Sequence, residues 1–218
     1  MITSNRMMIT SYKELPYKKY MEIQDTILYF DNDSDRTTQI ISVLNDLEFD
    51  DVENLTLTDY NRLAKQAEFL KYEITTEVKD IYPKLTINNR EYTLFTDIEN
   101  MTVAQYIDFS NYLKDAENKV PEMLSCFIIP KDAEQYNKDY DIQEVIKDIN
   151  EYLDVYTVKQ LSNFFFLLSQ SLTKGFLKSK IGTMKKMARK EKNKALRKTM
   201  MERVKAIEKD YQHIIGSL

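Results

Sequence analysis

The chain has 218 residues and a formal net charge of -4, and it contains 3 glycines, 1 cysteine and 1 histidine. All glycines lie from position 175 onward, which excludes a P-loop or a Gly-x-Gly-x-x-Gly turn before that point, because both motifs need backbone positions that only glycine fills. With Cys126 and His213 as the single residues of their types, zinc sites built from Cys and His and nucleophile systems that rely on His are also excluded within one chain. We therefore expect a protein that is not an enzyme and that binds no metal and no cofactor.

The sequence also bears on location. A single cysteine cannot form an intramolecular disulfide, which fits a reducing compartment. The first residues are not followed by an apolar run, and no window approaches the ~20 apolar residues of a membrane span. We expect no signal peptide, no membrane partner and a cytoplasmic location.

Charge is distributed unevenly along the chain. Residues 1–173 carry 17 Lys/Arg and 31 Asp/Glu, a net charge of -14, whereas residues 174–218 carry 14 Lys/Arg and 4 Asp/Glu, a net charge of +10. This pattern indicates an acidic body followed by a basic tail.

The body is predicted to be mainly helical, because good helix formers and helix-spaced apolar residues dominate it. Capping boxes, in which a small polar residue is followed three positions later by Glu or Gln, predict helix starts at three places. They are Ser11/Glu14, Thr102/Gln105 and Thr157/Gln160.

One segment of the body, residues 84–95, differs from the rest. Leu85 and Ile87 alternate with polar residues, and Tyr92 and Leu94 alternate again after Asn88-Asn89. Because asparagine tolerates positive φ, this pattern predicts a short β-hairpin in the middle of the body.

Three blocks of similar sequence recur in the same order, which predicts an internal duplication of a helix, helix, loop, helix unit. The alternative is chance similarity between amphipathic helices. The paired blocks are 15–23 with 101–109, 41–44 with 124–127, and 55–63 with 153–161. The expected fold is therefore mainly α, an internally duplicated helical body with a short central hairpin and a long basic C-terminal helical tail. Its expected parts are a first helical repeat unit at 1–82, the hairpin with a second repeat unit at 83–173, and the tail at 174–218.

Apolar residues in the tail recur every three or four positions, as in a heptad stripe. The stripe is our candidate partner-binding surface: Met200, Val204, Ile207, Tyr211 and Ile214. Residues 189–194 before it have little to bury and form either an exposed helix or a break between two helices. Three roles remain open for the tail: a solvated helix with a partner-facing stripe, contact with nucleic acid phosphates, or docking onto an acidic body, its own or a neighbour's.

Other candidate sites favour structural roles. Residues 31–35 begin like a calcium loop, but Arg36 stands where glycine is needed, and residues 132–141 form a second acidic loop. Cys126 lies among apolar residues and is predicted to be a core residue. Phe164–166 is predicted to be core, with a partner surface as the alternative, and the aromatic and cationic residues at 12–20 are predicted to pack rather than to bind nucleic acid.

Residues 40–63, followed by 68–70, resemble a segment of phage tail assembly chaperones. In those proteins an apolar helix is followed by an acidic Val-x-x-Leu-x-Leu-x-Asp turn, which here runs from Val52 to Asp59, and by a helix that ends in Phe-Leu. Residues 101–109 and 124–130 look like uncharacterised proteins from the structural-gene modules of phages and integrated elements of gut Bacteroidetes. The resemblance covers about residues 12–172.

The resemblance implies a non-enzymatic helical protein made in the host cytoplasm during virion assembly, which shields apolar helices of a tape-measure-like client. Its partners would be other phage structural proteins, and a homo-oligomer is compatible with this role. Two alternatives stay open. One is a permanent virion protein, such as a head–tail connector or a neck or tail ring subunit, and the other is a protein that binds nucleic acid through the basic tail.

Overall fold

The computed structural model describes residues 8–76, 83–97, 100–191, 193–194, 196–202 and 204–205. The chain divides into two compact units, Met1–Asn163 (unit 1) and Phe164–Leu218 (unit 2). Helix α8 (Val155–Lys190) runs through the boundary between them. The described residues are mainly helical, with one small antiparallel sheet, and this confirms the predicted mainly α class; the long basic helical tail stays a prediction.

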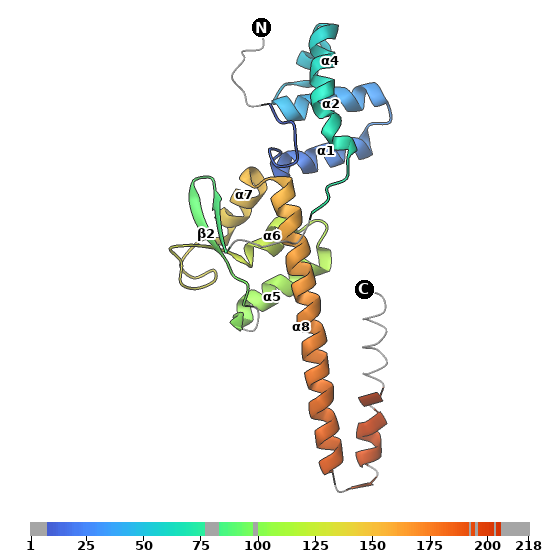
Figure 1. Cartoon of the computed structure of the whole chain (residues 1–218), viewed down its shortest axis with the longest axis vertical. Helices are drawn as coiled ribbons and strands as arrows, with labels where there is room; N and C mark the ends of the chain where they lie inside the picture. Colours follow the sequence, from blue (N-terminus) through green and yellow to red (C-terminus); the bar gives the residue numbers. More distant parts are fainter. Residues whose placement is uncertain are drawn as a thin grey trace. The chain divides into compact units, whose positions relative to one another are not determined.

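Unit 1 begins with a group of helices (Figure 1) that bury two apolar clusters. Leu15, Ile23, Leu44 and Val155 form the first, so the start of α8 packs with the first helices, and Ile41, Val52 and Leu63 form the second. The helical elements are α1 (Tyr17–Tyr29), α2 (Asp33–Asn45), α3 (Phe49–Glu53), α4 (Leu57–Gln66) and the 3-10 helix η1 (Ala67–Lys71).

Two backbone hydrogen bonds join the start of α1 to the start of α8. The Tyr17 N–H donates to the carbonyl of Leu153, and the Val155 N–H donates to the carbonyl of Leu15. Because these partners lie far apart in the sequence, the two bonds close unit 1 around its core.

The sheet has the order β1 (Lys84–Ile87), β2 (Arg90–Leu94), β3 (Ile128–Pro130), and all its pairs are antiparallel. At the β1–β2 turn, Asn88 and Asn89 have φ values of 49° and 61°. The predicted hairpin is therefore confirmed. The third strand was not predicted.

The rest of unit 1 packs around this sheet. Helix α6 packs against α7, and α7 also packs against α1, β1 and β3. Phe109 and Phe127 meet edge to face in the core, with ring centroids 4.9 Å apart. The elements are α5 (Val103–Tyr112), the 3-10 helix η3 (Leu113–Asp115), α6 (Val120–Ser125), α7 (Ile142–Tyr152) and the start of α8.

One of the three predicted capping boxes is present in full, and two predictions were wrong. Thr102 and Gln105 form both bonds of the box at the start of α5. Ser11/Glu14 lies in a turn before α1, where the Glu14 carboxylate accepts from Thr10. The start of α8 is capped by Asp154, whose carboxylate accepts from the N–H and the hydroxyl of Thr157, so the helix begins before the predicted box.

The predicted internal duplication is not confirmed. The first aligned blocks both start helices, α1 at Tyr17 and α5 at Val103. However, α2 has 13 residues, whereas the aligned α6 has 6 and is followed by strand β3. The duplication stays a prediction.

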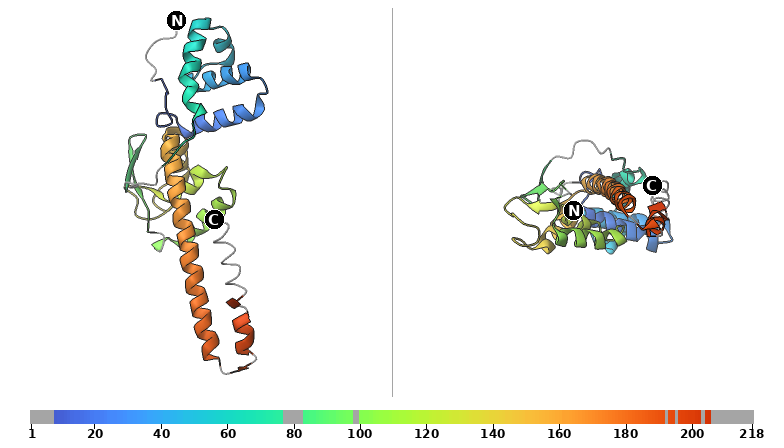
Figure 2. Two further views of the ribbon diagram at one scale, coloured as in Figure 1. Left: turned by 45° about the vertical axis from the view of Figure 1, so that its right-hand side comes forward. Right: turned by 90° about the horizontal axis from the view of Figure 1, so that it is seen from below.

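Unit 2 begins within α8 and continues beyond its end. Residues 194, 196–202 and 204–205 are helical and lie beside the last turns of α8 (Figures 1 and 2). Asn193 caps this second helical segment, because its side chain accepts from the Leu196 N–H. Of the two alternatives for residues 189–194, the structure therefore has the break between two helices.

In the described part of the chain, no helix combines the length and the apolar character that a bilayer span requires.

Candidate protein-interaction surfaces

The predicted partner-binding stripe of the tail lies only partly within the described residues. Met200 is half-buried and Val204 has no exposed surface. Ile207, Tyr211 and Ile214 lie outside the described residues. The stripe as a partner surface stays a prediction.

The acidic loops serve as helix caps and turn anchors. The Asn32 side chain accepts from the Ser34 N–H at the start of α2, and the Asp141 carboxylate accepts from the Gln143 N–H at the start of α7. In the second loop, Asp139 accepts from two backbone N–H groups, those of residues 134 and 135. Among the described residues, no group of three or more His, Cys, Asp or Glu residues is arranged to hold a metal ion.

Cys126 is fully buried in unit 1, as the sequence predicts. The Gln105 side-chain amide donates to its carbonyl at 2.5 Å, and the Tyr136 hydroxyl lies 3.6 Å from its sulfur and donates to Asp108 at 3.1 Å. Burial raises the pKa of the Cys126 thiol to about 12. The thiol is therefore protonated at neutral pH, which does not suit a nucleophile.

The aromatic and cationic residues before and within α1 pack against one another. The Tyr12 ring meets the rings of Tyr20 and Phe69 edge to face, with centroids 6.3 Å and 5.1 Å apart. The Lys13 ammonium lies 4.7 Å from the centre of the Tyr156 ring. These half-buried rings belong to the core, so they are not a free platform for base stacking.

The predicted core role of the Phe164–166 run holds for its middle residue. Phe165 is fully buried, Phe164 is half-buried, and Phe166 is exposed, as is Leu167 after it. The run thus also leaves apolar surface accessible in unit 2.

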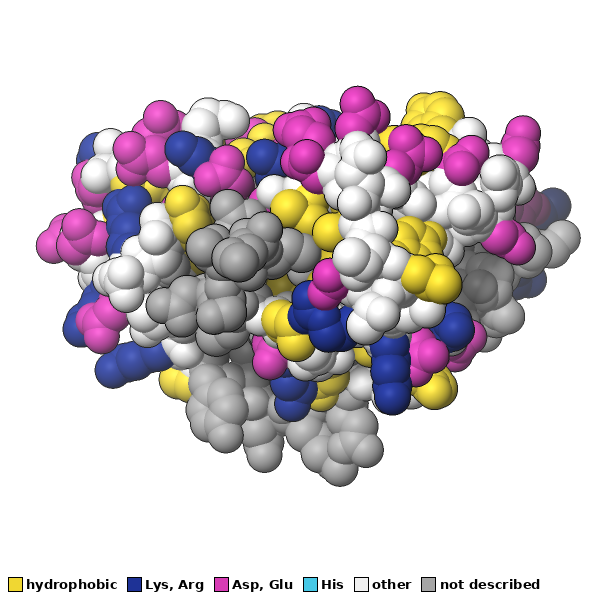
Figure 3. Space-filling view, turned by 90° about the horizontal axis from the view of Figure 1, so that it is seen from above, with side chains coloured by type: hydrophobic (Ala, Val, Ile, Leu, Met, Phe, Trp, Pro, Cys, Tyr) yellow, Lys and Arg dark blue, Asp and Glu magenta, His cyan; other side chains and the backbone are white. Residues whose placement is uncertain are grey.

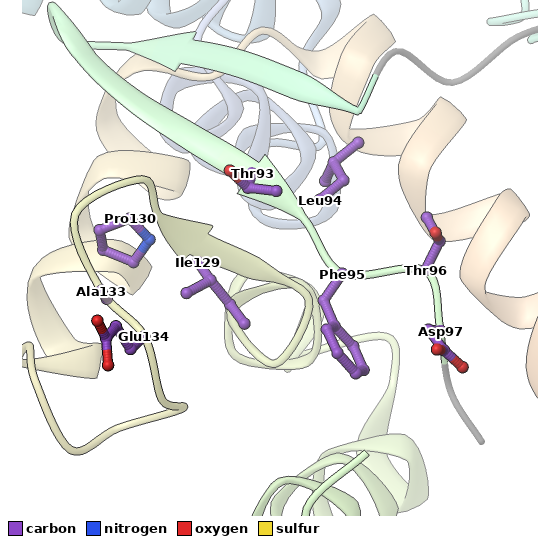
Figure 4. A pocket seen from close by; sticks show the side chains of 9 residues that line it. All are labelled: Thr93, Leu94, Phe95, Thr96, Asp97, Ile129, Pro130, Ala133 and Glu134. Carbon is purple, nitrogen blue, oxygen red and sulfur yellow. The ribbon is translucent and has the colours of Figure 1, made fainter. Parts of the chain in front are cut away.

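Unit 1 has a shallow hollow where β2 ends beside β3, with a volume of about 330 Å³ (Figure 4). Its lining is mostly apolar or hydroxyl-bearing, and it includes two carboxylates, those of Asp97 and Glu134. The lining residues are Thr93, Leu94, Phe95, Thr96, Asp97, Ile129, Pro130, Ala133 and Glu134.

A second hollow, of about 310 Å³, lies between the hairpin turn and α7. Two polar contacts cross it: Arg90 contacts Glu144 at 3.2 Å, and the Tyr92 hydroxyl donates to Asp148 at 2.5 Å. These contacts hold the hairpin against α7.

The most distinctive exposed apolar surface of unit 1 lies on α5. Val103, Tyr106 and Ile107 are 76%, 60% and 51% exposed, whereas Gln105 and Phe109 on the other side of the helix are buried. We call these three exposed residues the α5 face. They stand at i, i+3 and i+4, the spacing that presents side chains on one side of a helix.

The α5 face carries no charge. The other exposed residues of α5, Ala104 and Asn111, are uncharged, and Asp108, the one charged residue of the helix, is half-buried and accepts from Tyr136. A chain in which 30% of residues are charged would ordinarily place some of them on an exposed helix side. The α5 face is therefore our candidate interaction surface.

A second exposed apolar group lies at the end of α1, where Leu28 and Tyr29 are 79% and 82% exposed. It is surrounded in the sequence by Asp25, Asp31 and Asp33. In the view of Figure 3, acidic side chains are interspersed with hydrophobic ones. This group serves below as a matched control for the α5 face.

Comparison with protein-family models, with curated proteins and with solved structures finds no match to this chain. The α5 face was not predicted from the sequence. The sequence does carry a signal for this face: apolar residues occur around the whole circumference of a short helix, so burial of one side leaves some of them exposed.

Proposed function

We propose that this protein is a non-enzymatic phage morphogenesis protein that acts as a tail assembly chaperone and binds apolar helical segments of a client. The α5 face carries the proposal, because it offers three uncharged apolar side chains at helix spacing. Recognition of a helix by an apolar surface uses anchors at this spacing. The resemblance of residues 40–63 and 68–70 to a segment of phage tail assembly chaperones supports the assignment, as does that of residues 101–109 and 124–130 to uncharacterised proteins from phage structural-gene modules.

The charge of unit 1 indicates the kind of client. Unit 1 has a net charge of -14, so a client helix flanked by Lys or Arg would meet it faster and more selectively than an acidic one. The apolar α5 face would then supply the contact that keeps the client bound.

The charge of unit 2 favours a second candidate, a permanent virion protein such as a head–tail connector or ring subunit. Unit 2 has a net charge of +10, opposite to that of unit 1, and opposite charges on two parts of one chain suit repeated contacts between copies.

The composition of mature particles tests the proposal. Particles purified from an infected or induced culture are analysed by mass spectrometry beside the total lysate. We expect the protein to be abundant in the lysate and missing from particles. Its presence in particles at a fixed ratio to other components would contradict the chaperone role and support the virion role.

Paired variants in the phage genome test the α5 face itself. Tyr106→Ser with Ile107→Ser should lower the yield of tailed particles, because the client loses its apolar contact. Leu28→Ser with Tyr29→Ser, an apolar pair that is even more exposed, should leave the yield unchanged. Equal losses in both variants would argue against a specific role of the α5 face.

A further inference from the structure

We propose that copies of this chain associate head to tail, with the basic unit 2 of one copy docking on the acidic unit 1 of the next, and with the α5 face as the apolar centre of the contact. The charges of the two units are the first argument. Two copies of unit 1 would bring together two charges of -14, and two copies of unit 2 would bring together two charges of +10. Only contact of unit 1 with unit 2 joins opposite charges.

The surroundings of the α5 face fit this arrangement. Asp97 lies before α5, and Asp115 and Glu117 follow it, and all three are exposed. The α5 face is thus an uncharged apolar surface with exposed Asp97 before its helix and a mixed group, Lys114, Asp115, Glu117 and Lys119, after it. A suitable occupant has an apolar centre and basic residues around it.

Unit 2 contains a surface of this description near the end of α8. Met187 is 58% exposed, and Lys186, Arg189 and Lys190 beside it are exposed as well. Methionine is flexible and polarizable, so it adapts to apolar surfaces of varied shape. Lys190, at i+3, shares the side of the helix that Met187 occupies, whereas Lys186 and Arg189 are exposed on other sides of the helix, so the basic partner of the acidic unit 1 is the end of α8 as a whole.

Association between two different surfaces is heterologous, so each copy keeps one free donor and one free acceptor until a ring closes or a filament grows. The inference goes beyond the proposed function, because it concerns contacts between copies and needs no client. Both contacts use the α5 face, so a client helix and the next copy would compete for it. We expect assembly to grow with concentration and to weaken with salt.

Sedimentation velocity of the purified full chain tests the inference. We expect species larger than a monomer at ~50 mM salt and about a tenfold weaker association at ~0.5 M, since screening shortens the reach of exposed charges from ~10 Å near 0.1 M to ~3 Å near 1 M. A wild-type chain that is monomeric at every concentration and salt would overturn the inference.

Two variants locate the contact. The acceptor variant carries Tyr106→Ser and Ile107→Ser, and the donor variant carries Lys186→Glu and Lys190→Glu. Each should be monomeric alone. Mixed together they should form a 1:1 dimer and nothing larger, because the donor variant keeps its α5 face and the acceptor variant keeps its basic surface.

The other outcomes of the same experiment overturn the inference. If the donor variant associates as the wild type does, the contact joins two α5 faces. If the mixture stays monomeric, the two surfaces do not meet. If the Leu28→Ser, Tyr29→Ser control loses association as fully as the acceptor variant, the α5 face has no special role. Far-UV circular dichroism confirms folding, and Val103→Ser replaces the acceptor pair if that pair loses helical signal.

Discussion

The Gln105 side chain determines how α5 presents its exposed face. It closes the capping box with Thr102 and donates to the carbonyl of Cys126, and only 2% of the residue is exposed. A buried amide that keeps its bonds avoids a desolvation cost of about 1–3 kcal/mol. Because Gln105 and Phe109 are held inward, the helical period leaves Val103 and Ile107 pointing outward.

The buried thiol of Cys126 predicts a loss of stability at alkaline pH. Burial raises its pKa to about 12 from the ordinary 9.0, so the folded state keeps the proton that the unfolded state loses first. The stabilising effect is therefore present below pH 9 and is lost as the pH rises toward 12. We expect the free energy of unfolding in urea to fall by about 1.4 kcal/mol between about pH 8 and 10 because of this group.

The variant Cys126→Ala isolates that contribution. It is less stable overall because it leaves a cavity, but its free energy of unfolding should fall less steeply over the same pH range. Equal slopes in the variant and the wild type would show that the thiol ionises as readily in the folded state as in the unfolded one.

Among the elements, the hairpin depends on two residues with positive φ. Asn88 and Asn89 both lie in the left-handed region, which β-branched residues enter only at a cost of roughly 1–2 kcal/mol. We expect Asn89→Val to lower the free energy of unfolding in urea by about that amount, and Asn89→Gly to leave it unchanged or slightly raised. A Val variant as stable as the Gly variant would contradict the turn geometry.

The same hairpin shows what the sequence could and could not predict. The turn, the alternation in both strands and the Thr102/Gln105 box depend on near neighbours, so local patterns revealed them. Strand β3 depends on pairing between Leu94 and Ile128, which lie far apart in the chain. Its short apolar run is also typical of a buried turn or helix end, so nothing local distinguished a strand.

The α5 face could not be predicted for a related reason. Apolar residues on both sides of a helix indicate that either side could be buried, but they do not show which side the fold covers. The choice is made by Phe109 packing on Phe127 and by the buried Gln105, and both contacts join distant parts of the sequence.

At the scale of the whole molecule, the charge division and the unit division agree. The predicted basic tail begins at 174, and unit 2 begins at Phe164, but residues 164–173 carry no charge. The net charges of -14 and +10 therefore belong to the two compact units themselves. The net charges of the two units have opposite signs, which is the condition that head-to-tail association requires.

Unit 1 should fold without unit 2. Its cores use Leu15, Ile23, Leu44 and Val155, all of which lie within residues 1–163. We expect the fragment 1–163 to give a helical circular dichroism spectrum and a cooperative urea transition. The matched fragment 1–150 lacks the start of α8.

The comparison of the two fragments rests on what α8 contributes before residue 164. The shorter fragment loses the buried side chains of Val155, Val158 and Leu161, each contributing about 1.5–3 kcal/mol, together with the backbone bonds that join α1 to α8. That loss is comparable to the whole stability of a domain, so fragment 1–150 should show no cooperative transition. If both fragments unfold alike, the start of α8 does not complete the core of unit 1.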